Sequence, residues 1–287
     1  MIDHRAMQLY GQYTHKQISR RQFLEKLAIV VGGVAAAYAV LPLLENSVGQ
    51  AEIIAAGDTR LESKIVQFPI ATGLMSGYQS QLKNIDKMPA ILVVHENRGL
   101  NPHIEDVARR FALEGFLVLA PDALSPLGGS PAEPEKAIEM IKTLNMTETV
   151  KNFSAAAAYL KTHPQSTGKV GVVGFCWGGA LANSLAVQSA DIIAAVPYYG
   201  MQPSTEDVVK IKAALLLHYA SLDERINKGI PELKEALVKN GVEHELYMYE
   251  GADHAFNNDT NAARYNKPAA ELAWKRTIEF LTRKLKT

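Results

Sequence analysis

Residues 170–179 decide the fold of this 287-residue chain and read Val-Gly-Val-Val-Gly-Phe-Cys-Trp-Gly-Gly. The run Val170–Gly174 is apolar and rich in β-branched residues, which is typical of a buried parallel strand. A helical pattern begins at Trp177, so strand and helix meet at Cys176 in a Gly-x-Cys-x-Gly turn. Such a turn strains the backbone of its central residue and needs the flanking glycines, because a side chain there would collide with a neighbouring strand or helix. The stretch therefore predicts a nucleophile elbow with sulfur in place of the serine oxygen.

Short apolar runs alternate with helical patterns from about Leu61 to the C-terminal end. This alternation predicts one doubly wound α/β domain, with a mostly parallel sheet of about eight strands and helices on both faces. The expected strands are Ile65–Phe68, Leu74–Gln81, Ala90–His95, Phe116–Ala120, Val170–Gly174, Ile192–Pro197, Ala213–Tyr219 and Glu243–Tyr249. The expected helices are His103–Glu114, Glu133–Leu144, Glu148–Lys161, Trp177–Ser189, Asn227–Asn240 and Asn261–Lys284.

Composition excludes several classes of function. The chain has 30 Lys or Arg and 30 Asp or Glu, so it lacks the basic excess that a general nucleic-acid binder needs. Its single cysteine, Cys176, excludes an intramolecular disulfide and any CxxC motif. His95 and Glu96 resemble the start of a zinc motif, but the second histidine would fall at Gly99. We therefore expect no metal and no cofactor.

The N-terminal stretch has the layout of an export signal. Ser19–Leu24 contains two adjacent arginines and precedes the uncharged run Leu27–Leu44. The string resembles a twin-arginine signal, which would make the bacterial twin-arginine translocase a partner during export and place the protein in the periplasm. Cleavage after Ala51 and cleavage after Gly57 both fit the small residues there, and a retained membrane anchor is the alternative. The expected division is an export segment, 1–57, and one domain, 58–287.

The residues that follow the buried strands carry the chemistry, since ligands of open α/β sheets bind beyond the carboxyl ends of the strands. Asp223 and His254 each follow such a strand, and the order nucleophile, acid, histidine is that of the α/β-hydrolases. His254 would take the thiol proton of Cys176, and Asp223 would orient the imidazole and stabilise its cation. A buried structural cysteine is the alternative, but the glycines, the strand-to-helix context and these partners favour a nucleophile.

Two backbone amides are candidates for the oxyanion hole, and two side chains are weaker candidates for substrate binding. The amide of Trp177 follows the nucleophile, and that of Asn97 lies on the loop after the Ala90–His95 strand. Tyr199 follows a buried strand and is expected to line the pocket, and Arg98 lies on the loop after the Ala90–His95 strand.

The set Glu96, Gly174–Gly179, Asp223 and Gly251–Phe256 resembles the dienelactone hydrolases, also called carboxymethylenebutenolidases, from about Ile65 to the C-terminal end. The resemblance implies an α/β-hydrolase fold and a Cys176, His254, Asp223 triad. It also implies that Glu96 holds the resting thiol until substrate displaces it.

The family's carboxylate-clamping arginines are absent from the matching positions, which hold Pro126 and Asn258. Arg98 and Arg225 are the candidates to replace these arginines, and the alternative for each is a solvated surface arginine with no contact to substrate. A small, largely uncharged ester or lactone is therefore the expected substrate.

Two other classes of function remain as alternatives. A peroxide-reactive sensor or scavenger thiol would form a sulfenic acid at Cys176 without using Asp223. A binding protein on a hydrolase scaffold would have no use for the complete set of triad residues.

Overall fold

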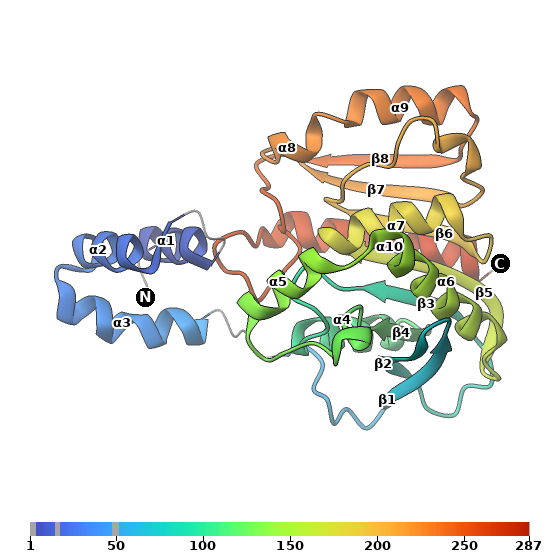
Figure 1. Cartoon of the computed structure of the whole chain (residues 1–287), viewed down its shortest axis with the longest axis horizontal. Helices are drawn as coiled ribbons and strands as arrows, with labels where there is room; N and C mark the ends of the chain where they lie inside the picture. Colours follow the sequence, from blue (N-terminus) through green and yellow to red (C-terminus); the bar gives the residue numbers. More distant parts are fainter. Residues whose placement is uncertain (1–3, 15–17, 48–51, 287) are drawn as a thin grey trace. The chain divides into compact units, whose positions relative to one another are not determined.

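The computed structural model describes residues 4–14, 18–47 and 52–286 (Figure 1). It divides into two units, one of Met1–Ala51 with Ala255–Glu271 and one of Glu52–His254 with Leu272–Thr287. The second unit holds all eight strands of the sheet.

The sheet has the strand order β1-β2-β4-β3-β5-β6-β7-β8, so β1 and β8 are its edges. β1 pairs with β2 and β2 with β4 in antiparallel fashion, and the remaining neighbours are parallel. The strands are β1 Leu61–Ile70, β2 Gly73–Leu82, β3 Met88–Val94, β4 Leu117–Pro121, β5 Ser166–Phe175, β6 Ile192–Tyr198, β7 Ala214–Ala220 and β8 His244–Tyr249. The predicted α/β-hydrolase fold is confirmed, because each expected strand lies within or overlaps one of these.

Helices cover both faces of the sheet (Figure 1). They are α4 Pro102–Leu113, α5 Pro134–Thr143, α6 Met146–Thr162, α7 Trp177–Gln188, α8 Glu224–Asn227, α9 Ile230–Lys239 and α10 Lys267–Leu285, with short 3₁₀ turns at Ser125–Leu127 and Val208–Lys210. On one face, side chains of α6, α7 and α9 form a core with alternate strand residues such as Val170 and Val172. Gly171, between those two valines, points to the other face, toward Leu281 and Leu285 of α10. This alternation is what a strand buried on both sides requires.

Two helices begin later in the chain than the periodicity predicts. The expected helix Asn227–Asn240 is broken at Gly229, and the second part starts just before Pro231. The expected helix Asn261–Lys284 begins only at Lys267, where Pro268 occupies the first turn. Proline lacks an N–H donor and its ring collides with the carbonyl four residues earlier, so it favours a first turn over a helix interior.

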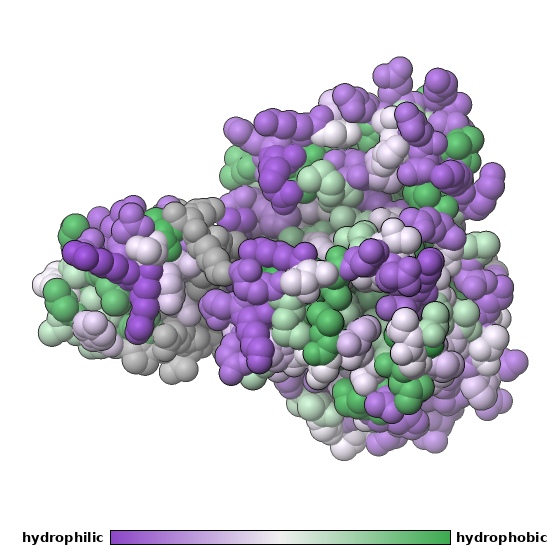
Figure 2. All heavy atoms as spheres, viewed as in Figure 1, coloured by the Kyte–Doolittle hydropathy of each residue, from purple (hydrophilic) through white to green (hydrophobic). Residues whose placement is uncertain are grey.

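The first unit contains the helices α1 His4–Thr14, α2 Arg20–Val31 and α3 Val34–Ser47. Ser19 and Gln22 form a capping box at the start of α2, so the arginine string coincides with a well-capped helix start. Ile29 is 82% exposed, and Figure 2 shows hydrophobic residues among hydrophilic ones on the visible face of these helices. No single helix in the described part of the chain is long and apolar enough to cross a membrane. Taken together, α2 and the segment Val34–Leu41 are long and apolar enough, but the two helices are bent by 105° relative to each other.

Candidate active site

The elbow between β5 and α7 places Cys176 at the carboxyl end of the sheet. Its backbone has φ 56° and ψ −112°, a conformation that residues other than glycine rarely adopt. A Cβ at Gly174 would lie 1.9 Å from the carbonyl oxygen of Gly178, and one at Gly178 would lie 2.4 Å from that of His95. Both glycines are therefore required by close backbone approaches, as the sequence predicted.

Three side chains from distant parts of the chain form a continuous relay beside the elbow. The Nε2 atom of His254 lies 3.0 Å from the Sγ atom of Cys176. On the other side of the imidazole, Nδ1–H donates to Asp223 Oδ2 at 2.5 Å. Asp223 is buried and also caps α8 by accepting a hydrogen bond from the amide of Ile226. The carboxylate is thus held from two directions and keeps the imidazole oriented toward the sulfur.

The electrostatics of the relay favour a charged histidine. Burial alone lowers the pKa of His254, but the hydrogen bonds to Asp223 and Cys176 outweigh it and raise that pKa to about 10. Burial raises the pKa of Asp223, yet the hydrogen bond from His254 outweighs this and holds the pKa below its usual value. The site therefore stabilises an imidazolium between a carboxylate and a sulfur.

Two residues of the pocket lining have backbone amides without a hydrogen-bond acceptor in the described part of the chain. Asn97 and Trp177 line the same pocket as Cys176, and neither amide N–H donates to another group in residues 4–14, 18–47 and 52–286. The Trp177 amide is at the first position of α7, where helix amides lack an intrahelical acceptor. Unpaired amides of this kind are able to bind a developing oxyanion.

A pocket of about 420 Å³ opens at Cys176 and has a largely apolar lining. The corner between α5 and α6 supplies one wall, through Ile138, Ile141, Leu144 and Met146. The remaining lining residues are Asn97, Lys142, Cys176, Trp177, Ala180, Tyr199, Met201, Arg225 and Ile226. A pocket of this size and polarity suits a small organic molecule.

Of the weaker candidates, the structure brings Tyr199 to the pocket but not Arg98. The Tyr199 ring also lies 5.1 Å from the His254 ring, centroid to centroid. Arg98 is half-buried and lies outside the pocket lining, whereas Arg225, an alternative, is exposed and within it. Glu96 is buried two residues beyond the end of β3. The side-chain hydrogen bond of the Cys176 thiol goes to His254. A restraining contact from Glu96 to the thiol stays a prediction.

Sequence reasoning missed the α5–α6 wall and the contacts of His95. The apolar stripe of α5 predicts burial, but it carries no signal that the stripe ends in a pocket. In the sequence His95 resembles only part of a zinc motif, because its contacts come from Ala123, on the loop after β4, and from Trp177 of α7. No group of three or more His, Cys, Asp or Glu able to hold a metal ion occurs in the described residues.

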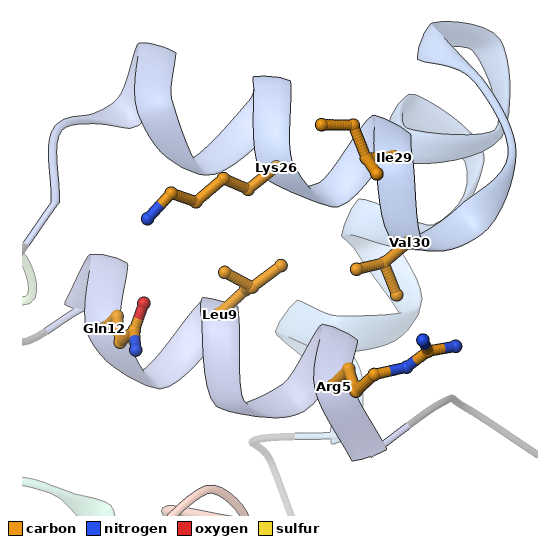
Figure 3. Close-up of a pocket in the computed structure, with 6 residues that line it drawn as sticks. All are labelled: Arg5, Leu9, Gln12, Lys26, Ile29 and Val30. Atoms are coloured by element: carbon orange, nitrogen blue, oxygen red, sulfur yellow. The ribbon is translucent and has the colours of Figure 1, made fainter.

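A second pocket lies between α1 and α2 in the other unit (Figure 3). It measures about 340 Å³ and is lined by Arg5, Leu9, Gln12, Lys26, Ile29 and Val30. This lining contains no nucleophile and no acid–base pair, so the candidate active site is the one at Cys176.

Comparison with known proteins decides the family. The model of the dienelactone hydrolase family matches residues 75–285, which include the elbow, Asp223 and His254. The chain belongs to the dienelactone hydrolase family. It is therefore a member of a hydrolase family, with the α/β-hydrolase fold described above.

Two dienelactone hydrolase relatives and one solved structure give the extent of the similarity. A Saccharolobus solfataricus protein named "Putative carboxymethylenebutenolidase" is 33% identical over 230 residues, covering 68% of this chain and 89% of the relative. A Bradyrhizobium protein named "Probable 2-oxo-3-(5-oxofuran-2-ylidene)propanoate lactonase" is 31% identical over 209 residues, covering 68% of this chain and 84% of the relative. The crystal structure of a "Putative Dienelactone Hydrolase" from Klebsiella pneumoniae superposes with a TM-score of 0.72 at 26% identity, covering 78% of this chain and 99% of that one.

Proposed function

We propose that this chain hydrolyses an ester or lactone bond of a small molecule through a thioester on Cys176. The observation that carries the proposal is the relay from Asp223 through His254 to the sulfur, with both hydrogen-bonding separations at or below 3.0 Å. The sulfur attacks the carbonyl carbon, and the oxyanion accepts hydrogen bonds from the Asn97 and Trp177 amides. The carbon–oxygen bond then breaks, and His254 gives its proton to the leaving oxygen.

In deacylation His254 accepts a proton, whereas in acylation it gives one to the leaving oxygen. Once acylated, the sulfur is a neutral thioester, so its contribution to the raised pKa of His254 disappears. The imidazole then takes a proton from water, and the hydroxide attacks the thioester carbon. The carbon–sulfur bond breaks, the acid leaves, and the thiol is restored. Glu96 would hold the resting thiol before substrate binds, as the family resemblance implies.

The pocket lining supports a neutral substrate with an apolar part. The wall from α5 and α6 offers hydrocarbon contacts close to the nucleophile. Lys142 and Arg225 also line the pocket, but both are exposed to water, where an ion pair with a substrate carboxylate contributes at most about 1 kcal/mol. The geometry gives no separate support to the peroxide-reactive alternative. For the N-terminal segment, we propose a twin-arginine leader that delivers the enzyme to the periplasm.

An ester series tests this function and the role of the wall together. We expect kcat/KM for p-nitrophenyl esters to rise about threefold per methylene from acetate toward hexanoate, because each methylene buries apolar surface in the pocket. Met146→Ala should lower the hexanoate value about three- to tenfold and leave the acetate value within about twofold. The matched control is Val238→Ala, since Val238 is an exposed residue of α9 outside the pocket. A flat series, or a carboxylated lactone hydrolysed faster than every neutral ester, contradicts the neutral substrate.

A further inference from the structure

His95 is a buried titratable side chain that the mechanism above does not use. It lies at the end of β3 with an exposed fraction of 0%. Its Nδ1–H donates to the carbonyl oxygen of Glu96 at 2.6 Å, and its Nε2 accepts the amide hydrogen of Ala123 at 3.1 Å. Burial lowers the pKa of His95, which keeps the ring neutral with Nδ1 as its one donor.

The carbonyl that His95 holds shares a peptide group with one of the two candidate oxyanion donors. The peptide bond between Glu96 and Asn97 is planar and trans, so its C=O and N–H point in opposite directions. A hydrogen bond that fixes the carbonyl therefore also fixes the direction of the Asn97 N–H. Since Asn97 lines the pocket with Cys176, His95 orients this peptide from behind the pocket.

The same ring contacts the residue that carries the other donor. The His95 imidazole stacks on the Trp177 indole, with centroids 5.4 Å apart and an interplanar angle of 15°. The first turn of α7 also approaches the backbone of His95 at Gly178. One buried ring is thus in contact with both segments that carry the candidate oxyanion donors.

We propose that His95 is a positioning residue that fixes the two oxyanion donors relative to each other. The inference rests on the proposed function and adds a residue to it. It predicts a loss in the chemical step with little change in substrate binding, because the donors act on charge that develops in the transition state.

Two amide substitutions separate this role from a merely structural one. His95→Asn places an N–H donor near the position of Nδ1, whereas His95→Gln offers an acceptor near the position of Nε2 for Ala123. We expect His95→Gln to lower kcat about 10- to 100-fold with KM within about twofold, and to weaken a trifluoromethyl ketone inhibitor in parallel. His95→Asn should retain at least about a fifth of the wild-type kcat. Thermal unfolding checks that both variants are folded.

The outcomes distinguish the two proposals. A fully active His95→Gln variant, or an Asn variant weaker than the Gln variant, overturns the positioning role alone, because a simple anchor to Ala123 would favour glutamine. A wild-type chain without esterase activity overturns the proposed function and this inference with it.

A second inference rests on two buried charged side chains of α4, outside this site. Asp106 accepts hydrogen bonds from the amides of Ile53 and Ile54 at 3.0 and 2.8 Å. Arg109 donates from Nε to the carbonyl of Ile54 at 2.7 Å, and its Nη2 lies 3.2 Å from Glu52 Oε2. Asp106 also pairs with the Arg110 guanidinium, and Arg109 also donates to the Tyr78 hydroxyl at 2.8 Å. The segment Glu52–Ile54 thus completes the set of partners around two charges that are buried in the hydrolase unit.

The residues after this segment form a turn that leads into β1. The Asp58 amide donates to the Ala55 carbonyl at 3.0 Å, and the Asp58 carboxylate accepts from Arg60. Of the two cleavage positions expected from sequence, Ala51 lies outside the described residues. Cleavage after Gly57 would open the turn and leave Asp106 and Arg109 without these partners. We infer that the folded enzyme keeps Glu52–Gly57 after any removal of the leader.

Intact-mass analysis of the full chain, produced with a C-terminal tag in a bacterium that has the twin-arginine translocase, tests this inference. A purified folded enzyme that begins at Glu52 or earlier supports it, and one that begins at Asp58 overturns it. In the full chain, Asp106→Asn should also lower the unfolding midpoint by at least about 6 °C. Asp191→Asn, at an exposed ion pair with Lys161, should change it by less than about 2 °C. An unchanged midpoint for Asp106→Asn contradicts the inference.

Discussion

Replacing Cys176 with alanine is expected to lower kcat for a p-nitrophenyl ester on the order of 10³-fold or more. The sulfur is the nucleophile that contacts His254 in the relay, so its loss leaves the pocket and the oxyanion donors but removes the covalent step. Alanine retains a Cβ at φ 56°, so the strain of the elbow is unchanged and the fold should be retained. Steady-state kinetics with thermal unfolding as the folding control measure the effect.

Cys176→Ser is the stricter comparison for the same position. Serine keeps the shape of the side chain, but its hydroxyl is far less acidic than a thiol and relies fully on His254 for activation. We expect it to remain well below wild-type activity. A Cys176→Ala variant with wild-type turnover would remove the thioester from the mechanism.

Asp223→Asn is expected to lower kcat/KM on the order of 10³- to 10⁴-fold. Asparagine is a good helix N-cap, so α8 keeps its start, but it has an amide where the carboxylate accepts from His254 Nδ1–H. The imidazole then loses both its orientation and the charge that stabilises its cation. The matched control is Asp207→Asn, which removes a carboxylate from an exposed ion pair with Lys210.

The pH dependence gives this variant a second readout. In the wild type the pKa of His254 is about 10, so the imidazolium that protonates the leaving oxygen persists at neutral pH and is lost only as pH rises toward 10. Removing Asp223 removes the largest contribution that raises this pKa. The alkaline limb of the kcat/KM profile should therefore move to lower pH. An unshifted limb would show that His254 does not control it.

The sequence predicted the elements that depend on local pattern. Continuous apolar runs identified the strands, and Gly174 and Gly178 marked the elbow, because a close backbone approach leaves no alternative to glycine. The order of Cys176, Asp223 and His254 along the chain was enough to expect them at one edge of a parallel sheet.

The remaining features depend on contacts between segments far apart in sequence. His95 meets Ala123 only because β3 and β4 are neighbours, and it meets Trp177 only because α7 begins beside it. The apolar corner at Met146 and the exposed Arg225 reach the pocket through the packing of α5, α6 and α8. Such contacts leave no periodicity in the sequence. The late starts of α9 and α10, by contrast, follow from the chemistry of Pro231 and Pro268 in their first turns.

Trapping the covalent intermediate tests the central claim most directly. The wild-type chain is mixed with a p-nitrophenyl ester, quenched in acid within the burst phase and digested, and the peptides are analysed by mass spectrometry. We predict one acyl group on the peptide that contains Cys176, its loss on treatment with hydroxylamine, and no adduct in Cys176→Ala. Ester turnover with no adduct, or with the acyl group on another residue, would contradict a thioester at the elbow.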